Sequence, residues 1–198
     1  MNKRKFLVSA ATIFGSSVAI TKTASPAELV SIRGQIILTI IGAVTKINRT
    51  HINTVNDQLM YKHGLHFDGA HEFSQADLQK LPFQTIKPTM EYDQRAHQLT
   101  GPRLLDVLAA AGAQLSDTTR IVFHGIDGYS PEVTWAQAKK YNYIVATHLD
   151  GKLLAIGGFG PLFAIYDADR ITELAAKPLN QRFFACPWGL YCIEVLNS

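Results

Sequence analysis

The sequence predicts an α+β fold in which mixed β-sheets are combined with short helices. Short runs rich in β-branched and aromatic residues recur along the chain, as in Gln35–Val44 and Ile121–Phe123. Helical patterns between these runs are brief, as in Trp135–Tyr141. The two kinds of element do not alternate regularly, which a parallel array of βαβ units would require. Together these observations favour several small sheets over one doubly wound sheet.

The first 27 residues have the pattern of a secretory signal peptide. A positive start at residues 3–5 precedes an apolar run at residues 6–20, and residues 25–27 supply small side chains for cleavage. The apolar run is too short for a stable membrane span, although an uncleaved anchor is the alternative. We therefore expect a periplasmic protein with a single domain in residues 28–198 and no membrane insertion after cleavage.

The charge of the chain depends on that leader. It holds four of the 19 Lys and Arg residues and none of the 16 acidic ones, so the remaining chain is close to neutral. A neutral surface gives no electrostatic case for nucleic acid or an anionic membrane as partner. Cys186 and Cys192 would lie about 20 Å apart on one extended strand, so we expect two free, mostly buried thiols. The alternative is a disulfide between them, which requires the chain to turn between the two cysteines.

The first elements can be placed from local signals. Gln35–Val44 predicts an early strand, residues 45–65 an irregular excursion, and Leu65–Phe73 a further short strand. Ser74 is the expected N-cap of a short helix. Asp77, three residues later, completes a capping box with it.

The next segment predicts a strand at Thr85–Met90 and a helix capped by Thr100, with Pro102 in its first turn. Gly112 closes that helix. Asp127-Gly128 and Asp150-Gly151 are turn signals. The remaining predicted strands are Ile121–Phe123, Tyr143–Thr147, Leu153–Ile156, Leu162–Tyr166 and Gly189–Leu196.

General motifs for catalysis or cofactor binding are few. The chain contains no phosphate loop, no dinucleotide-binding fingerprint and no Cys-x-x-Cys pair. The glycine-rich segment Gly157–Pro161 is typical of a loop that needs positive φ, or of one that brings backbone amides close to a flat ligand. The sequence leaves both readings open.

Two polar clusters could be taken for a metal site and a catalytic triad, but their spacing in the sequence supports neither. His63, His66 and His71 match no standard zinc spacing, so we interpret them as part of a solvated loop and expect no metal. Ser130 stands near His124 in sequence, but close sequence neighbours rarely form a catalytic triad.

A series of landmarks in a fixed order carries the family signal. The landmarks are Phe73–Pro82, Leu99–Ala113, Gly125–Tyr129, Leu149–Leu153, Gly160–Tyr166 and Trp188–Val195. With them, the chain from Phe73 to Val195 resembles the short, exported members of the oxidoreductase molybdopterin-binding family. The resemblance implies the sulfite-oxidase-type molybdopterin-binding fold.

The departures from the family pattern bear on activity. In the enzymes of this fold a cysteine thiolate ligates molybdenum, and the resemblance places that cysteine near Pro88–Glu91. The chain has Pro-Thr-Met-Glu there, and none of these side chains replaces a thiolate at a soft metal. Gly157, Gly158 and Phe159 stand where the family often has charged residues, which removes potential phosphate ligands. The resemblance thus leaves enzymatic activity open but favours a non-catalytic protein.

A pterin pocket is the function that remains. A pterin needs a π-face for stacking, polar partners for its amino-pyrimidine edge, and apolar walls. Each candidate residue also has an ordinary structural reading, such as Tyr166 as a core residue and Asp127 as a turn former. The candidate set in the family's loops is Asp93, Asp127, Gly128, Tyr129, Phe159, Gly160, Tyr166 and Trp188.

The resemblance therefore implies a non-catalytic periplasmic protein that binds a tetrahydropterin or molybdopterin-like ligand without molybdenum. It also implies a partner, the periplasmic domain of an inner-membrane cyclic-di-GMP signalling receptor. One alternative is a molybdenum-cofactor oxidoreductase with an unusual ligand such as Cys186. A second is a scaffold or interaction domain with an empty pocket, because fold alone does not establish function.

Overall fold

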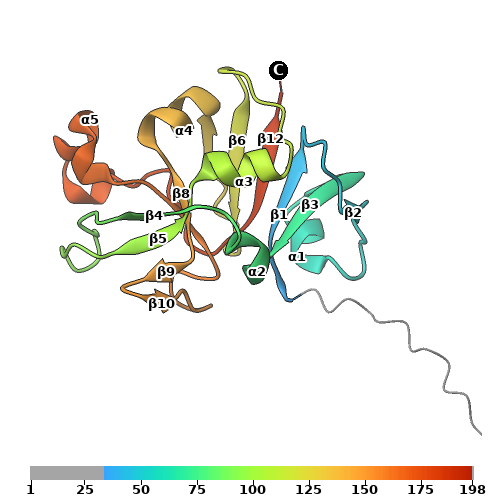
Figure 1. Cartoon of the computed structure of the whole chain (residues 1–198), viewed down its shortest axis with the longest axis horizontal. Coiled ribbons are helices and arrows are strands. Elements are labelled where there is room, and N and C mark those ends of the chain that lie inside the picture. The colour runs from blue at the N-terminus through green and yellow to red at the C-terminus, as the bar shows by residue number, and fades with distance from the viewer. Residues whose placement is uncertain (1–33, 198) are drawn as a thin grey trace, which may run out of the picture. The chain divides into compact units, whose positions relative to one another are not determined.

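The computed structural model describes residues 34–197, so the expected signal peptide lies outside the described residues. Three sheets form the framework of this part (Figure 1). The largest has the strand order β2 (Arg49–Thr50), β3 (Gly69–Ser74), β1 (Ile36–Gly42), β12 (Leu190–Leu196), β6 (Arg120–Gly125) and β7 (Glu132–Thr134). The second has the order β10 (Lys152–Leu153), β9 (His148–Leu149), β5 (Leu99–Pro102) and β4 (Phe83–Ile86), and the third pairs β11 (Phe163–Ile165) with β8 (Ile144–Ala146).

Short helices separate the strands. They are α1 (Gln58–Lys62), α2 (Gln75–Leu78), α3 (Leu104–Ala110), α4 (Trp135–Tyr141), η1 (Ala168–Arg170), α5 (Thr172–Ala175) and η2 (Leu179–Gln181). β1 and β12 come from opposite ends of the described chain and pair in parallel, whereas the other strand pairs are antiparallel. The α+β architecture with mixed sheets is therefore confirmed. Within the described residues, no helix has the length and apolarity that a membrane crossing requires.

β12 lies at the centre of the largest sheet, between β1 and β6. Its apolar run is almost entirely buried because both faces of the strand are covered. Side chains on one face of β12 pack in the main core. The helices α3 and α4 contribute Leu104, Leu108 and Trp135 to this core. A smaller apolar cluster, which includes Met60 of α1 and Tyr191 of β12, forms separately. Burying this much apolar surface is the main stabilising contribution to the fold.

Several local signals led to correct predictions. Ser74 and Asp77 form the expected capping box at the start of α2, and α4 has the predicted bounds. The Asp127-Gly128 turn has Gly128 at φ +88°, a conformation that glycine adopts without strain. Asp150 and Gly151 both have positive φ and join β9 to β10, as a two-residue hairpin turn requires.

The helix predicted to start at Thr100 is wrong at its beginning. Thr100 belongs to β5, where its hydroxyl lies 2.9 Å from that of Thr85 and its carbonyl accepts a hydrogen bond from Thr147 N. The N-cap of α3 is Arg103 instead. The strand predicted at Thr85–Met90 also ends early, at Ile86. Residues 87–98 then form a long excursion, which we call the Tyr92 loop.

The two cysteines are free and buried, and they belong to different apolar clusters. Cys186 lies in the main core, just before β12. Cys192 lies within β12 and packs in the smaller cluster beside α1. This arrangement agrees with the expectation of two separate thiols.

Candidate ligand-binding site

A cavity of about 220 Å³ opens where the Tyr92 loop, the turn after β6 and the segment before β12 meet. Five of its ten lining residues are aromatic, and two carboxylates, an amide and a thiol also line it. The aromatic residues are Tyr92, Tyr129, Phe183, Phe184 and Trp188, and the polar ones are Glu91, Asp127, Asn180 and Cys186.

Hydrogen bonds inside the turn after β6 hold Asp127 at this cavity. Gly128 N donates to Gly125 O at 3.0 Å, and Gly125 N donates to Tyr129 O at 2.9 Å. Asp127 Oδ1 accepts a hydrogen bond from Tyr129 N at 3.0 Å, which is the geometry of an Asx turn. A Cβ atom at Gly125 would lie 2.7 Å from this oxygen, so the turn needs glycine there. The result is an exposed carboxylate in a defined position.

The aromatic walls expose large apolar surfaces. Tyr92 is 60% exposed, Phe184 51% and Trp188 36%. The Trp188 backbone forms a bridge with Phe163 of β11, which fixes the chain beneath the ring. Clustered exposed aromatic groups are uncommon on a soluble protein and mark a surface that binds a ligand or a partner.

Two further hollows share residues with this cavity. One, of about 360 Å³, is lined by Tyr92, Ile126, Gly157, Gly158, Phe159 and Trp188. The other, of about 200 Å³, is lined by Met90, Tyr92, Asp93, His97, Leu149 and Phe159. The Tyr92 and Phe159 rings lie 5.5 Å apart between centroids. Tyr92 therefore forms part of the wall of all three spaces.

The candidate residues from the sequence divide into two groups. Asp127, Tyr129 and Trp188 line the 220 Å³ cavity, while Phe159 and Asp93 line the neighbouring hollows. The others line none of these three spaces. Gly128 shapes the Asp127 turn, Gly160 is buried, and Tyr166 is buried in the core with its hydroxyl donating to Arg182 O at 2.7 Å.

Glu91, Tyr92 and Phe184 were not among the residues expected at this site, and Cys186 was expected only as an unusual metal ligand. Glu91 lies at the end of the segment where the resemblance places a metal-binding cysteine, and it lines the cavity. Cys186 lines the same cavity from the main core and is only 6% exposed. Their nearness in sequence to Trp188 and to the Pro88–Glu91 segment was the signal that could have directed attention to them.

The titration behaviour of the lining groups follows from their burial. Burial strongly raises the pKa of the Cys186 thiol. A thiol of this kind stays protonated at neutral pH and reacts weakly as a nucleophile or metal ligand. Burial also raises the pKa of Tyr92, with the charge of Glu91 adding to the effect, and it raises the pKa of Tyr129. Both phenols therefore remain neutral hydrogen-bonding groups.

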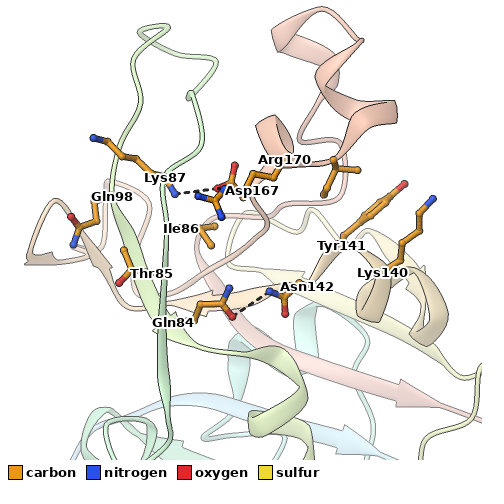
Figure 2. A pocket seen from close by; sticks show the side chains of 11 residues that line it. Gln84, Thr85, Ile86, Lys87, Gln98, Lys140, Tyr141, Asn142, Asp167 and Arg170 are labelled. Carbon is orange, nitrogen blue, oxygen red and sulfur yellow. Dashed lines mark hydrogen bonds and ion pairs between the residues drawn. The ribbon is translucent and has the colours of Figure 1, made fainter.

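A different hollow, of about 320 Å³, lies between β4, the end of α4 and η1 (Figure 2). Its lining is mostly amide and charged side chains, and Asn142 Nδ2 donates to Gln84 Oε1 at 3.3 Å. Asp167 accepts a hydrogen bond from Lys87 N at 3.4 Å, so this region anchors the start of the Tyr92 loop. It offers no set of exposed rings for a flat ligand.

Two of the three histidines of the 63–71 segment make structural contacts, and His66 is exposed. His63 Nδ1 lies 2.9 Å from the Tyr191 hydroxyl, and His71 Nδ1 contacts Lys46 O. Across residues 34–197, no three His, Cys, Asp or Glu side chains are grouped as a metal site would require.

Comparisons with known proteins bear on the fold. No protein-family model matches the chain, and no curated protein matches it. Among solved structures, the sulfane dehydrogenase SoxCD from Paracoccus pantotrophus is similar, with a TM-score of 0.52 and 14% sequence identity. The match covers 81% of this chain and 38% of that chain, so the chain spans little more than a third of the SoxCD length. The described chain thus has the sulfite-oxidase-type α+β fold that the sequence predicts.

Proposed function

We propose that this protein is a non-catalytic, periplasmic pterin-binding protein that holds a reduced pterin, without molybdenum, in the 220 Å³ cavity. The observation that carries the proposal is the combination of exposed aromatic rings with a fixed carboxylate at one small opening. A pterin ring presents a flat face and an edge of N–H donors. Trp188 and Tyr92 offer surfaces for the face, and Asp127 offers an acceptor for the edge.

The charge of the cavity also supports an unphosphorylated ligand. Glu91 and Asp127 are both acidic, and the described residues that line this cavity include no Lys, Arg or His. A phosphate group inside the cavity would meet repulsion from these carboxylates, and a nearby cation, Lys177, lies outside the lining, with its Nζ 5.8 Å from the Phe184 ring centroid. A tetrahydropterin therefore suits the cavity better than a phosphorylated molybdopterin-like ligand.

The donor set fits molybdenum poorly. The cavity offers two carboxylates and one thiol. That thiol is buried in the core and stays protonated because burial raises its pKa. Carboxylates prefer hard cations, whereas the resemblance implies a thiolate ligand for the metal. We therefore assign no chemical step to a metal here.

A binding titration tests the proposal. The purified protein is titrated anaerobically with tetrahydrobiopterin by calorimetry, alongside Asp127→Asn and the control Asp68→Asn, which alters an exposed carboxylate outside the cavity. Asp127→Asn should weaken binding about tenfold, because it removes a charge-assisted hydrogen bond. Asp68→Asn should bind like the wild type. Equal affinity for the wild type and Asp127→Asn would remove Asp127 from the site.

A second candidate function has one observation in its favour. Cys186 lines the cavity, so a molybdenum-cofactor oxidoreductase could use its sulfur atom as a metal ligand. Metal analysis of protein from cells that make the cofactor separates the two candidates. One molybdenum per chain, lost in Cys186→Ser, would favour the oxidoreductase over the pterin-binding protein.

The proposed partner is the periplasmic domain of an inner-membrane cyclic-di-GMP receptor, and it rests on the sequence resemblance. The exposed rings around the cavity would let such a partner sense whether the cavity is filled. Mixing the purified protein with that domain, with and without tetrahydrobiopterin, tests this directly. An interaction that does not depend on the pterin would contradict the signalling role.

A further inference from the structure

The Tyr92 loop is attached to its surroundings at both ends. At its start, Thr89 N donates to Asp169 Oδ2 at 2.7 Å, next to the contact between Lys87 N and Asp167 that Figure 2 shows. Within the loop, Met90 N donates to Arg95 O at 2.8 Å. At its end, Gln98 N donates to Asp150 Oδ1 at 2.9 Å and Asp150 N donates to Gln98 O at 2.8 Å, and the side chain of His97 contacts Asp150 as well. Tyr92 therefore lies in a loop that is held at both ends, and His97 is the contact at the second end whose strength depends on the protonation of an imidazole.

His97 lies between two carboxylates. Its Nδ1 is 2.6 Å from Asp150 Oδ2, and its Nε2 is 2.8 Å from Asp93 Oδ2. Asp150 is in the turn between β9 and β10, whereas Asp93 is in the Tyr92 loop itself. A neutral imidazole has only one N–H group, so both contacts are hydrogen bonds only when both ring nitrogens carry a proton.

The charges around the ring favour that protonated form. The hydrogen bond with Asp150, followed by that with Asp93, raises the pKa of His97 above its usual 6.5. The same contacts lower the pKa of both carboxyl groups. Two cations lie near these carboxylates, Lys87 beside Asp150 and Arg95 beside Asp93. The remaining residues of the hollow that His97 lines are uncharged.

We propose that His97 is a positioning residue: besides the Gln98 contacts, its imidazolium joins Asp93, the neighbour of Tyr92, to Asp150 in the β9–β10 turn and so holds Tyr92 in the wall of the ligand cavity. The inference rests on the proposed function for the identity of the ligand. Both hydrogen bonds of His97 form at pH values above the lowered pKa of the two carboxyl groups and below the raised pKa of His97. As pH rises through that last value, the ring loses a proton and one of its two hydrogen bonds. Pterin affinity should therefore fall on the alkaline side.

NMR of the ligand-free protein tests the positioning step by itself. The His97 imidazole and the Tyr92 backbone amide are followed from pH 5 to pH 9 in isotope-labelled protein. The Tyr92 amide shift should follow the titration of His97. In His148→Gln, which removes an imidazole outside the three hollows, the Tyr92 amide should still titrate. In His97→Gln it should not.

Affinity measurements then test the consequence for the ligand. Between pH 6 and pH 9, the dissociation constant for tetrahydrobiopterin should rise about threefold more in the wild type than in His97→Gln. The reason is that the wild type loses one exposed ion pair over this range. The comparison with His97→Gln removes the titration of the pterin itself. If no pterin binds, a Tyr92 amide that titrates with His97 still supports the attachment. A Tyr92 amide shift that does not follow the titration of His97 refutes the attachment, even if a pterin binds.

Discussion

Replacing Trp188 by Leu should weaken pterin binding far more than it weakens the fold. The Trp188 ring is 36% exposed at the cavity rim, so a ligand has access to its face. Stacking of a flat heterocycle on an aromatic side chain contributes about 1–3 kcal/mol, which corresponds to about 5- to 150-fold in the dissociation constant. Leu retains apolar contact but offers no π-face. We expect a loss of about twentyfold, near the middle of this range.

The two tryptophans of the chain provide the assay. Trp135, the first residue of α4, is 5% exposed, whereas Trp188 faces solvent at the cavity. In Trp135→Phe, all tryptophan emission comes from Trp188, and tetrahydrobiopterin should quench it with the dissociation constant that calorimetry measures. Melting curves control for folding. Two results would refute the stacking role of Trp188. One is a dissociation constant of Trp188→Leu within twofold of the wild-type value, and the other is Trp188 emission that does not change when the ligand binds.

Three further predictions concern the framework around the site. Gly101→Ala should destabilise the protein by about 3 kcal/mol in urea unfolding, because its Cβ would lie 2.0 Å from the Val145 carbonyl oxygen. Asp77→Asn should cost about 1 kcal/mol at pH 7, since it removes the carboxylate of a capping box. The hydrogen bond from Lys80 lowers the pKa of Asp77, so its contribution is present above the unfolded value of 3.8 and is lost as pH falls further. Cys186 should react slowly with a disulfide reagent at pH 8 in the folded protein and rapidly after unfolding, because burial raises its pKa.

Each of these predictions has its own control. Gly158→Ala should be almost neutral for stability, because the nearest atom to its Cβ would be Ala155 O at 3.5 Å. An equal loss in Gly158→Ala and Gly101→Ala would contradict the packing argument. For Asp77, a stability difference that persists unchanged at pH 2 would contradict the role of its charge. Fast modification of Cys186 in the folded protein would show that its thiol is accessible.

The elements that the sequence predicted well are those with local causes. The capping box at Ser74 and the turn at Asp150-Gly151 depend only on residues within a few positions of one another. The start of α3 could not be predicted in this way. Thr100 has good N-cap chemistry, but Thr85 and Thr147 hold it in β5, and these partners lie far from it in the sequence.

The site was predictable to a similar extent. Asp127 and Trp188 belong to the landmarks of the resemblance, and the structure brings both to the same cavity. Tyr92 was missed because an aromatic residue in a loop has no periodic pattern that distinguishes it from its neighbours. Cys186 was considered only as an unusual metal ligand, since nothing local shows that it lines the same cavity as Glu91. Tyr166 has the right chemistry for stacking but is enclosed by the core.

Native mass spectrometry of the protein isolated from cells that make reduced pterins tests the central proposal most directly. We expect a population in which each chain carries one small organic ligand with the mass of a reduced pterin, and we expect no molybdenum. The ligand should dissociate on denaturation, because only stacking and polar contacts hold it. A stoichiometric molybdenum cofactor in the intact chain would contradict the account.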